Sequence, residues 1–399
     1  MRTVTDGVPA ERPPAPSAHP PKGDATATHP PVPVVGTSAA ILAVAPVPAA
    51  VGESQATRLR QARWRLWEPR RRRLPGLTLA VVVLAGVCLL SVWIGANHLP
   101  FTVVWRVLWH DDGSQAAVVV HDLRIPRTLL GLVVGAALGV AGALTQALTR
   151  NDLVEPGMLG VSIGASAAVV VAISVFGITS PAGYVWFSLV GAAVTSVAVF
   201  AIGATGRSGT SPATLVVTGA AATAVLGSFV YAALLLDTRT FDQFRHWDVG
   251  SLAVRGSGSL TATAPIMAAG LLIACTLGRP LNALALGDEA ARGLGVRLHR
   301  ARVSGAVAVV LLCGGATAAA GPITFVGLAV PHIARVIAGP DNRWVLPYSA
   351  VLAPVLLIGS DLVGRVIIAP GELQVGVVTA FVGAPVFIVL CRRARLGRA

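Results

Sequence analysis

Long apolar segments recur along most of this chain, and they constrain its fold more than any other feature. Each is about the length that a helix needs to cross a lipid bilayer, roughly 20 residues. Ten such segments are expected, at 77–96, 128–148, 158–177, 184–204, 212–236, 260–278, 303–320, 322–338, 346–368 and 375–391. Glycines recur at helical spacing in the second, which predicts close packing of that helix against others. We therefore predict an all-α, polytopic membrane protein of about ten transmembrane helices.

Composition and charge support a membrane protein and disfavour two other classes. The 399 residues are 54% hydrophobic and 12% charged, whereas a soluble domain typically carries about 25% charged residues. The net charge of +13 comes from arginines beside apolar segments, the pattern that orients membrane proteins rather than one that binds nucleic acid. The basic runs 58–73, 292–302 and 392–398 then lie in the cytoplasm. With an even number of spans, we predict a multi-pass protein of the cytoplasmic membrane with both termini cytoplasmic.

Three regions differ in organisation. Residues 1–75 are rich in proline and alanine and lack helical periodicity, so we expect a disordered cytoplasmic tail. The tail ends in the basic run 58–73, whose interleaved tryptophans favour contact with anionic lipid over contact with nucleic acid. Residues 76–393 form the predicted transmembrane domain, and residues 394–399 form a short basic tail.

The chain shows no means of hydrolysing ATP. A phosphate-binding loop needs a lysine after its glycines, and the sole lysine is Lys22 in the tail. Energy for transport must then come from a separate ATPase or from an ion gradient, and an ion-coupled carrier remains an alternative. Asp361 and Arg365 share a helix face, and pairing between them is favoured over ion coupling. The histidines and cysteines lack ligand spacing, so we predict no metal site and no cofactor.

A cytoplasmic segment between two spans has the pattern of a compact knob. Leucines precede a glycine, and acidic residues then start a short helix that two glycines end. The positions are Leu281, Leu284, Leu286, Gly287, Asp288, Glu289, Gly293 and Gly295. We expect two short amphipathic helices that meet at Gly287, with Asp288 capping the second. Docking on another protein is favoured over a helix lying on lipid, because acidic residues would face anionic headgroups.

Four stretches together resemble a known family. They are LRIPRTLLGLVVGAALGVAGALTQALTRNDLVEPGMLGVSIGA (123–165), LNALALGDEAARGLGV (281–296), AGPITFVGLAVPHIARVIAGPDNRWVLP (320–347) and ELQVGVVTAFVGAPVFIVL (372–390). The chain resembles the iron-siderophore and cobalamin permeases (FecCD type) of type II ABC importers. The resemblance implies the type II importer permease fold, a second permease subunit (an identical copy or a paralogue), cytosolic ATP-binding subunits and an extracytoplasmic substrate-binding protein. It implies a metal-chelate substrate, with a ferric siderophore favoured and heme or cobalamin as alternatives; a membrane scaffold is disfavoured.

The resemblance also implies roles for individual residues. Outward-facing arginines that dock acidic residues of the binding protein match Arg124, Arg127 and Arg365. Cytoplasmic gate residues match Asn151, Leu153, Thr210 and Ser211. The element that couples to the ATPase matches Leu281 to Gly295. The chain departs from the family at Asp152 and Gln374, where proline is usual, and in its extended N-terminal tail.

Overall fold

The computed structural model describes residues 73–95, 99–110, 112–204, 212–253, 256–368 and 371–396, and every regular element within these ranges is helical. A helix occupies the place of each of the ten predicted segments. These helices are Arg73–Trp93, α4 (Ile125–Thr149), α5 (Val161–Ser174), α6 (Pro181–Ala204), α7 (Pro212–Leu236), α9 (Gly256–Ala285), α11 (Leu298–Ala320), α12 (Val326–Ala338), α13 (Asn342–Ile367) and α14 (Val375–Leu396). Seven are long and apolar enough to cross a membrane, and α5, α12 and the described apolar part of α14 are shorter. The all-α polytopic prediction is confirmed.

Helix α4 forms the centre of the described helices. It packs against α9, α11, α12 and α13, and 78% of its span is buried, against 11% for the helix Arg73–Trp93. Glycines allow this close packing: a Cβ added at Gly135 would lie 2.6 Å from the Cα of Pro354, and one at Gly142 would overlap the carbonyl of Gly327. The expected close packing at these glycines is confirmed.

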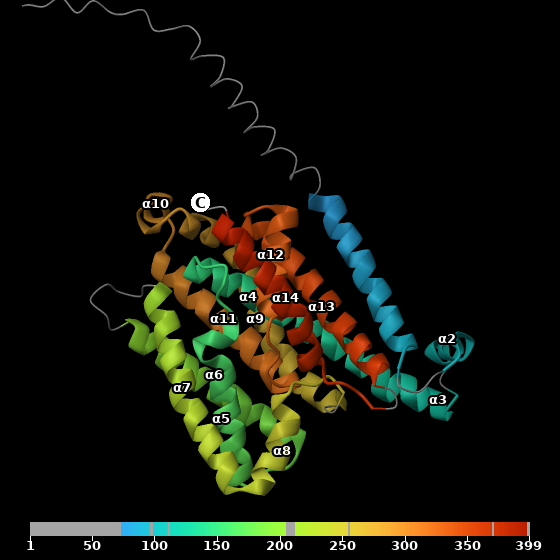
Figure 1. The fold of residues 1–399 in the computed structure, drawn as a ribbon. Helices are drawn as coiled ribbons and strands as arrows, with labels where there is room; N and C mark the ends of the chain where they lie inside the picture. The colour runs from blue at the N-terminus through green and yellow to red at the C-terminus, as the bar shows by residue number, and fades with distance from the viewer. Residues whose placement is uncertain are drawn as a thin grey trace, which may run out of the picture. The chain divides into compact units, whose positions relative to one another are not determined.

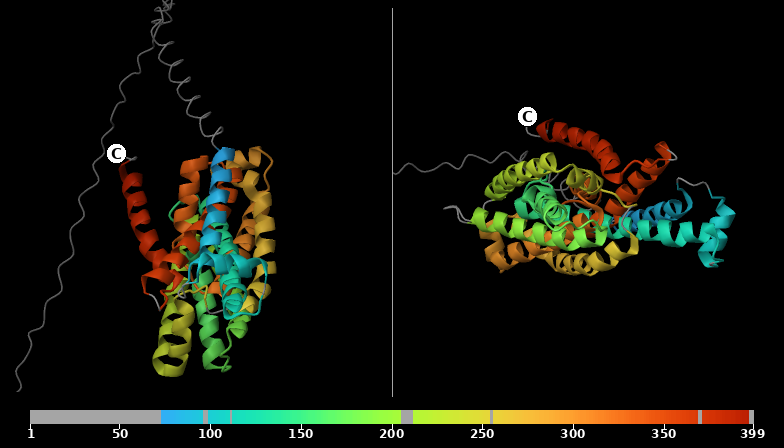
Figure 2. Two further views of the ribbon diagram at one scale, coloured as in Figure 1. Left: turned by 90° about the vertical axis from the view of Figure 1, so that its right-hand side faces the viewer. Right: turned by 90° about the horizontal axis from the view of Figure 1, so that it is seen from below.

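The bundle has two distinct ends. The start of the helix Arg73–Trp93, the short helix α10 (Asp288–Gly293) and the end of α14 lie at one end (Figure 1). Helix α8 (Thr238–Asp248) lies at the other, and α2 (Phe101–Trp109) and α3 (Gln115–Val118) lie toward it in the turned view (Figure 2).

Several short elements were not predicted from the apolar pattern, because none is long enough to span a bilayer. Helix α2 carries an aromatic row in which Phe101 stacks on Trp105 at 6.0 Å between ring centroids. Its Val104 and Val107 form a small separate core with Ala117 of α3 and Val120 of the segment that follows. A π-helix, η1 (Val119–Arg124), joins α3 to α4, and a 3-10 turn, η2 (Pro156–Leu159), precedes α5.

Candidate functional site

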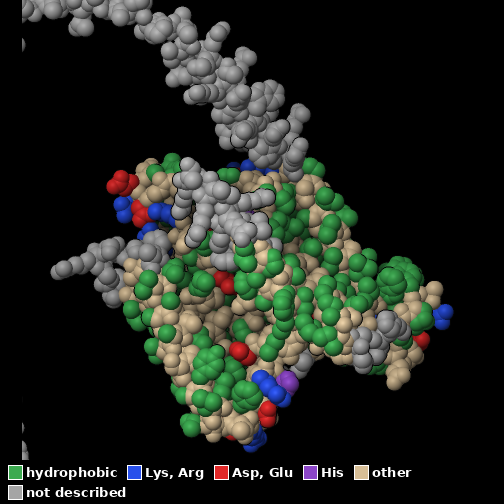
Figure 3. Space-filling view, viewed as in Figure 1, with side chains coloured by type: hydrophobic (Ala, Val, Ile, Leu, Met, Phe, Trp, Pro, Cys, Tyr) green, Lys and Arg blue, Asp and Glu red, His purple; other side chains and the backbone are tan. Residues whose placement is uncertain are grey.

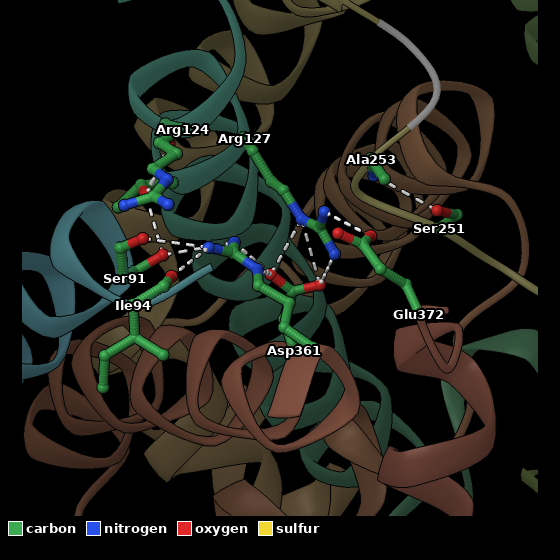
Figure 4. Close-up of polar contacts among 10 residues, drawn as sticks. Ser91, Ile94, Arg124, Arg127, Ser251, Ala253, Asp361 and Glu372 are labelled. Atoms are coloured by element: carbon green, nitrogen blue, oxygen red, sulfur yellow. Dashed lines mark hydrogen bonds and ion pairs between the residues drawn. The ribbon is translucent and has the colours of Figure 1, made fainter. Parts of the chain in front are cut away.

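Two arginines close in the sequence, Arg124 and Arg127, meet a distant third, Arg365, at the end of the bundle opposite α10. Arg124 ends η1, Arg127 lies in the first turn of α4, and Arg365 lies in the last turns of α13. Positive charge at the start of α4 is unfavourable for its helix dipole. Two carboxylates offset it, Asp361 on α13 and Glu372 in the loop before α14 (Figure 4).

Asp361 is the centre of this cluster and is completely buried. Its carboxylate accepts hydrogen bonds from Nη2 of Arg127 at 2.7 Å and from Nε of Arg365 at 2.9 Å. The pairing of Asp361 with Arg365, predicted from their spacing, is confirmed. Arg127 also donates to Glu372 at 2.7 Å, and the Glu372 side chain is 34% exposed. One buried carboxylate thus holds two guanidinium groups.

The other contacts of the cluster tie it to the first helix. Nη1 of Arg365 donates to the carbonyl of Ser91 at 2.9 Å, and Nη1 of Arg124 donates to the carbonyl of Val92 at 3.0 Å. Carbonyls at a helix C-terminus lack partners within the helix. The arginines supply those partners, so they fix the end of Arg73–Trp93 against α4 and α13.

The expectation that these arginines stand at an outward rim needs correction. Arg124 and Arg365 are 5% and 2% exposed, because they bind backbone carbonyls and Asp361 rather than water. All three arginines line a recess of about 210 Å³, together with Glu372 and Ala253. Three cations face two carboxylates there, so the recess keeps a net positive charge.

The loop after α4 carries two of the predicted gate residues, Asn151 and Leu153. Arg150 ends α4 in the left-handed conformation (φ 50°), and Oδ1 of Asn151 then accepts a hydrogen bond from the backbone N–H of Leu153 at 3.0 Å. Both residues are exposed. The other two predicted gate residues, Thr210 and Ser211, lie outside the described residues.

Asp152, one departure from the family pattern, has a partner in the structure. Its Oδ1 lies 3.0 Å from Nη1 of Arg335 on α12, and the same nitrogen donates to Oε1 of Gln146 at 2.7 Å. Gln146 is buried on α4 and donates in turn to the carbonyl of Leu328 at 3.2 Å. The charge of Asp152 is therefore balanced within the chain. Gln374, the other departure, directly precedes α14, and its carbonyl accepts from the N–H of Val377 at 3.1 Å.

The coupling segment was predicted to form two short helices, but the structure shows only one. Leu281 and Leu284 are buried on the last turns of α9, which continues through Pro280 to Ala285, because their side chains pack into the main core. Only the second part forms a short helix of its own, α10. Leu286 is 67% exposed beside it. Gly287 joins the two with φ +104°, a conformation that residues with a Cβ rarely adopt. Gly295 follows with φ +78°.

Asp288 does not cap α10 as expected, because arginines of two neighbouring helices bind its carboxylate instead. Arg150 at the end of α4 forms an ion pair with it, and Nη2 of Arg302 on α11 lies 2.7 Å away. The hydrogen bond from Arg150, and then that from Arg302, lowers the pKa of Asp288 against the opposing effect of burial. Its neighbour Glu289 is exposed. Asp288 thus connects the turn at Gly287 to the loop that follows α4.

A cavity of about 670 Å³ opens among α5, α8, α12 and α14. Its lining is mainly apolar, and it includes the carboxylates of Glu155 and Asp248. Acidic side chains are visible within the hollowed centre of this face (Figure 3). Oε1 of Glu155 accepts a hydrogen bond from the N–H of Phe325 at 2.7 Å, at the start of α12. Phe325 has φ +68°, so the carboxylate holds a strained turn at the cavity wall.

Sequence reasoning missed Glu155, Asp248 and Arg335. Glu155 lies within a stretch quoted for its family resemblance, and its place before a Pro-Gly pair and an apolar segment was the available signal. Only tertiary packing places Asp248 at the cavity and Arg335 beside the loop that follows α4. Among the residues that the structure describes, no group of three His, Cys, Asp or Glu is placed to hold a metal ion.

The long apolar helices form a bundle with a charged recess at one end and helix α10 at the other. A separate open cavity lies among the helices. These are the features of a polytopic membrane permease. The chain belongs to the FecCD transport family, whose sequence model matches residues 82–393. This family consists of permease subunits of ABC transporters.

The chain is similar to several transport proteins over nearly the whole length of each. The chain is 44% identical to a ferric enterobactin transport system permease protein of Escherichia coli, over 82% of this chain and 96% of that protein. It is 34% identical to a hemin transport system permease protein of Yersinia pestis, over 79% and 94%. A solved structure described as an inward-facing metal-chelate type ABC transporter has a TM-score of 0.71 and 25% identity, and the match covers 79% of this chain and 98% of that one.

Proposed function

We propose that this protein is the permease subunit of an ABC importer that carries a ferric siderophore across the cytoplasmic membrane. The observation that carries the proposal is the 44% identity to the ferric enterobactin permease, which covers nearly that whole protein. Heme is the second candidate, because a hemin permease is 34% identical. ATP hydrolysis belongs to partner subunits, and a binding protein delivers the chelate.

The cavity lined by Glu155 and Asp248 supplies one wall of the translocation path in this proposal. Its apolar lining suits a bulky chelate, which crosses without specific ligands. Phe381 of α14 lines the cavity and is 75% exposed, so in a membrane it is covered by lipid or by another protein chain. A second permease subunit, either an identical copy or a paralogue, closes the path on this side.

Docking of the binding protein is proposed at the recess of Arg124, Arg127 and Arg365. An acidic side chain that enters the recess meets three guanidiniums and forms charge-assisted hydrogen bonds. Arg127 is the most accessible, since its partner Glu372 is partly exposed and exchanges with a carboxylate from outside. Arg127→Glu should then weaken binding of the binding protein in a salt-dependent manner, because like charges meet at the interface. Unchanged affinity would exclude docking at this recess.

The turn at Gly287 and helix α10 are proposed to contact the ATPase. Exposed Leu286 and Leu294 provide the apolar contacts, and the ion pairs of Asp288 transmit the movement of α10 to the loop that carries Asn151 and Leu153. In this proposal α10 faces the cytoplasm. Both termini then lie on the cytoplasmic side as well, because the first helix begins and α14 ends at that end of the bundle (Figure 1). Accessibility of a cysteine introduced at Glu289 tests this orientation.

The cargo is tested by uptake of radiolabelled metal in a strain that lacks this gene. The strain is supplied with single chelates: ferric enterobactin, ferric citrate or hemin labelled with radioactive iron, or cobalamin labelled with radioactive cobalt. Loss of ferric siderophore uptake, restored by the wild-type gene, supports the proposal. Loss of hemin uptake alone would favour the heme importer, and uptake that depends on an ion gradient without ATP would favour a secondary carrier.

Removing residues 1–55 while keeping the basic run 58–73 is expected to preserve uptake.

A further inference from the structure

A second large hollow of the chain lies between α6 and α11 and shares no residue with the cavity of Glu155. Its volume is about 790 Å³. Val197 and Phe200 of α6 face it from one side, and Val303, Ala306 and Val307 of α11 form the other side. Val197 and Val303 are 65% and 47% exposed. We call this hollow the α6–α11 groove.

One end of the α6–α11 groove is basic. Arg292 of α10 and His299 and Arg302 of α11 line it, and the part of the chain that the structure describes adds no acidic side chain to this lining. Asp288 is bound to Arg302 nearby, but it also neutralises Arg150 and therefore balances only one of these two charges. Three of the described lining residues are basic and none is acidic, so this end of the groove carries a net positive charge.

The dimensions match one leaflet of a bilayer. The lining of α11 runs from Arg302 to Leu311, which at 1.5 Å per residue spans roughly 14 Å. That length is about half of a hydrocarbon core of roughly 30 Å. The basic end lies beside α10, where the apolar part of α11 begins, so a lipid headgroup at the membrane surface lies at the same depth.

We propose that the α6–α11 groove binds an anionic phospholipid. The phosphate contacts Arg292, His299 and Arg302, and one acyl chain lies between Phe200 and Val307. The apolar wall favours a lipid over a free phosphate, which would need only the basic end. The charge favours an anionic lipid over a zwitterionic one, whose choline cation would face the arginines. Because Arg302 also holds Asp288, the bound lipid steadies the position of α10.

The test measures lipid bound to the full-length, purified chain. Native mass spectrometry in detergent counts retained phosphatidylglycerol, with phosphatidylcholine as the neutral probe. Each basic residue near an anionic lipid surface contributes about 1 kcal/mol of binding free energy, so its removal should weaken lipid binding by about fivefold. Arg292→Gln is therefore expected to lose about that factor, and Ala306→Phe, which fills the groove without changing charge, is expected to abolish binding.

Two matched controls lie outside the groove. Arg300→Gln removes a cation from the same turn of α11, and Val194→Phe enlarges an exposed apolar residue of α6. Both should retain phosphatidylglycerol like the wild type, and circular dichroism checks that every variant is folded.

Three results would each overturn the proposal. Equal retention of phosphatidylcholine would remove the role of charge. Wild-type binding by both Arg292→Gln and Ala306→Phe would place the lipid elsewhere. Saturation by glycerol phosphate with the same affinity would leave an anion site without an acyl chain. None of these results depends on transport, so the lipid site and the proposed cargo fail separately.

Discussion

The buried carboxylate of Asp361 offers the sharpest test of what holds the arginine cluster together. Asp361→Asn preserves the shape of the side chain and removes the charge that Arg127 and Arg365 share. Four nitrogen atoms of the two guanidiniums donate to this carboxylate. Removing one partner of a buried ion pair costs about 3–5 kcal/mol, because the remaining charge stays in the interior without compensation. Arg365 loses this carboxylate, whereas Arg127 keeps Glu372 at 2.7 Å, so a loss within that range is expected.

Thermal unfolding of the detergent-solubilised protein measures this loss. A destabilisation of that size should lower the apparent Tm on the order of 10 °C. Glu372→Gln is the matched control: it removes the other carboxylate bound to Arg127, but the Glu372 side chain is 34% exposed. Water replaces part of that interaction, so the expected loss is at most about 1 kcal/mol.

A double variant tests whether the loss of stability comes from leaving Arg365 without its carboxylate or from removing a polar group. Asp361→Asn combined with Arg365→Met removes both charges, and the free energy of unfolding should recover part of the loss seen with Asp361→Asn alone. Equal stability of Asp361→Asn and Glu372→Gln would refute this reasoning. Strictly additive losses in the double variant would show that the two side chains are not coupled.

Three further changes test other parts of the structure. Gly287→Val is strained at φ +104° and should abolish ligand-stimulated ATP hydrolysis in liposomes that contain the partner subunits, whereas Gly86→Val, at an open helical position, should not; normal stimulation would reject coupling through this turn. Gly142→Val should separate α4 from α12 and prevent recovery of folded protein by size exclusion, whereas Gly359→Val has open space and should be tolerated; equal recovery would contradict the packing. Asp288→Asn should lower the Tm by the same amount from pH 8 to pH 5, because the pKa of Asp288 is lowered in the folded state. Its contribution is complete above the ordinary pKa of an aspartate and is lost as the pH falls from there through the lowered value. A difference that shrinks near pH 6 would contradict it.

The sequence determined the class of fold and the places of the long helices. A bilayer requires long apolar segments, and ten such segments could be counted without knowing how they pack. Local spacing was sufficient for the pair of Asp361 and Arg365, and the glycines of α4 indicated close packing. It was also sufficient to place Arg124 and Arg127 beside the membrane, but it did not show that they would be buried.

Only the tertiary structure decided which distant residues meet. Arg127 and Glu372 are 245 positions apart, and they bond because the start of α4 and the loop before α14 lie side by side. Leu281 and Leu284 joined α9 rather than a separate helix, since the main core buries them. Asp152, an unexplained charge in the sequence, is balanced by Arg335 of α12. The apolar pattern of each segment follows from the lipid that surrounds it, so it can be recognised in the sequence. Ion pairs depend on how the helices pack against one another, which the apolar pattern does not determine.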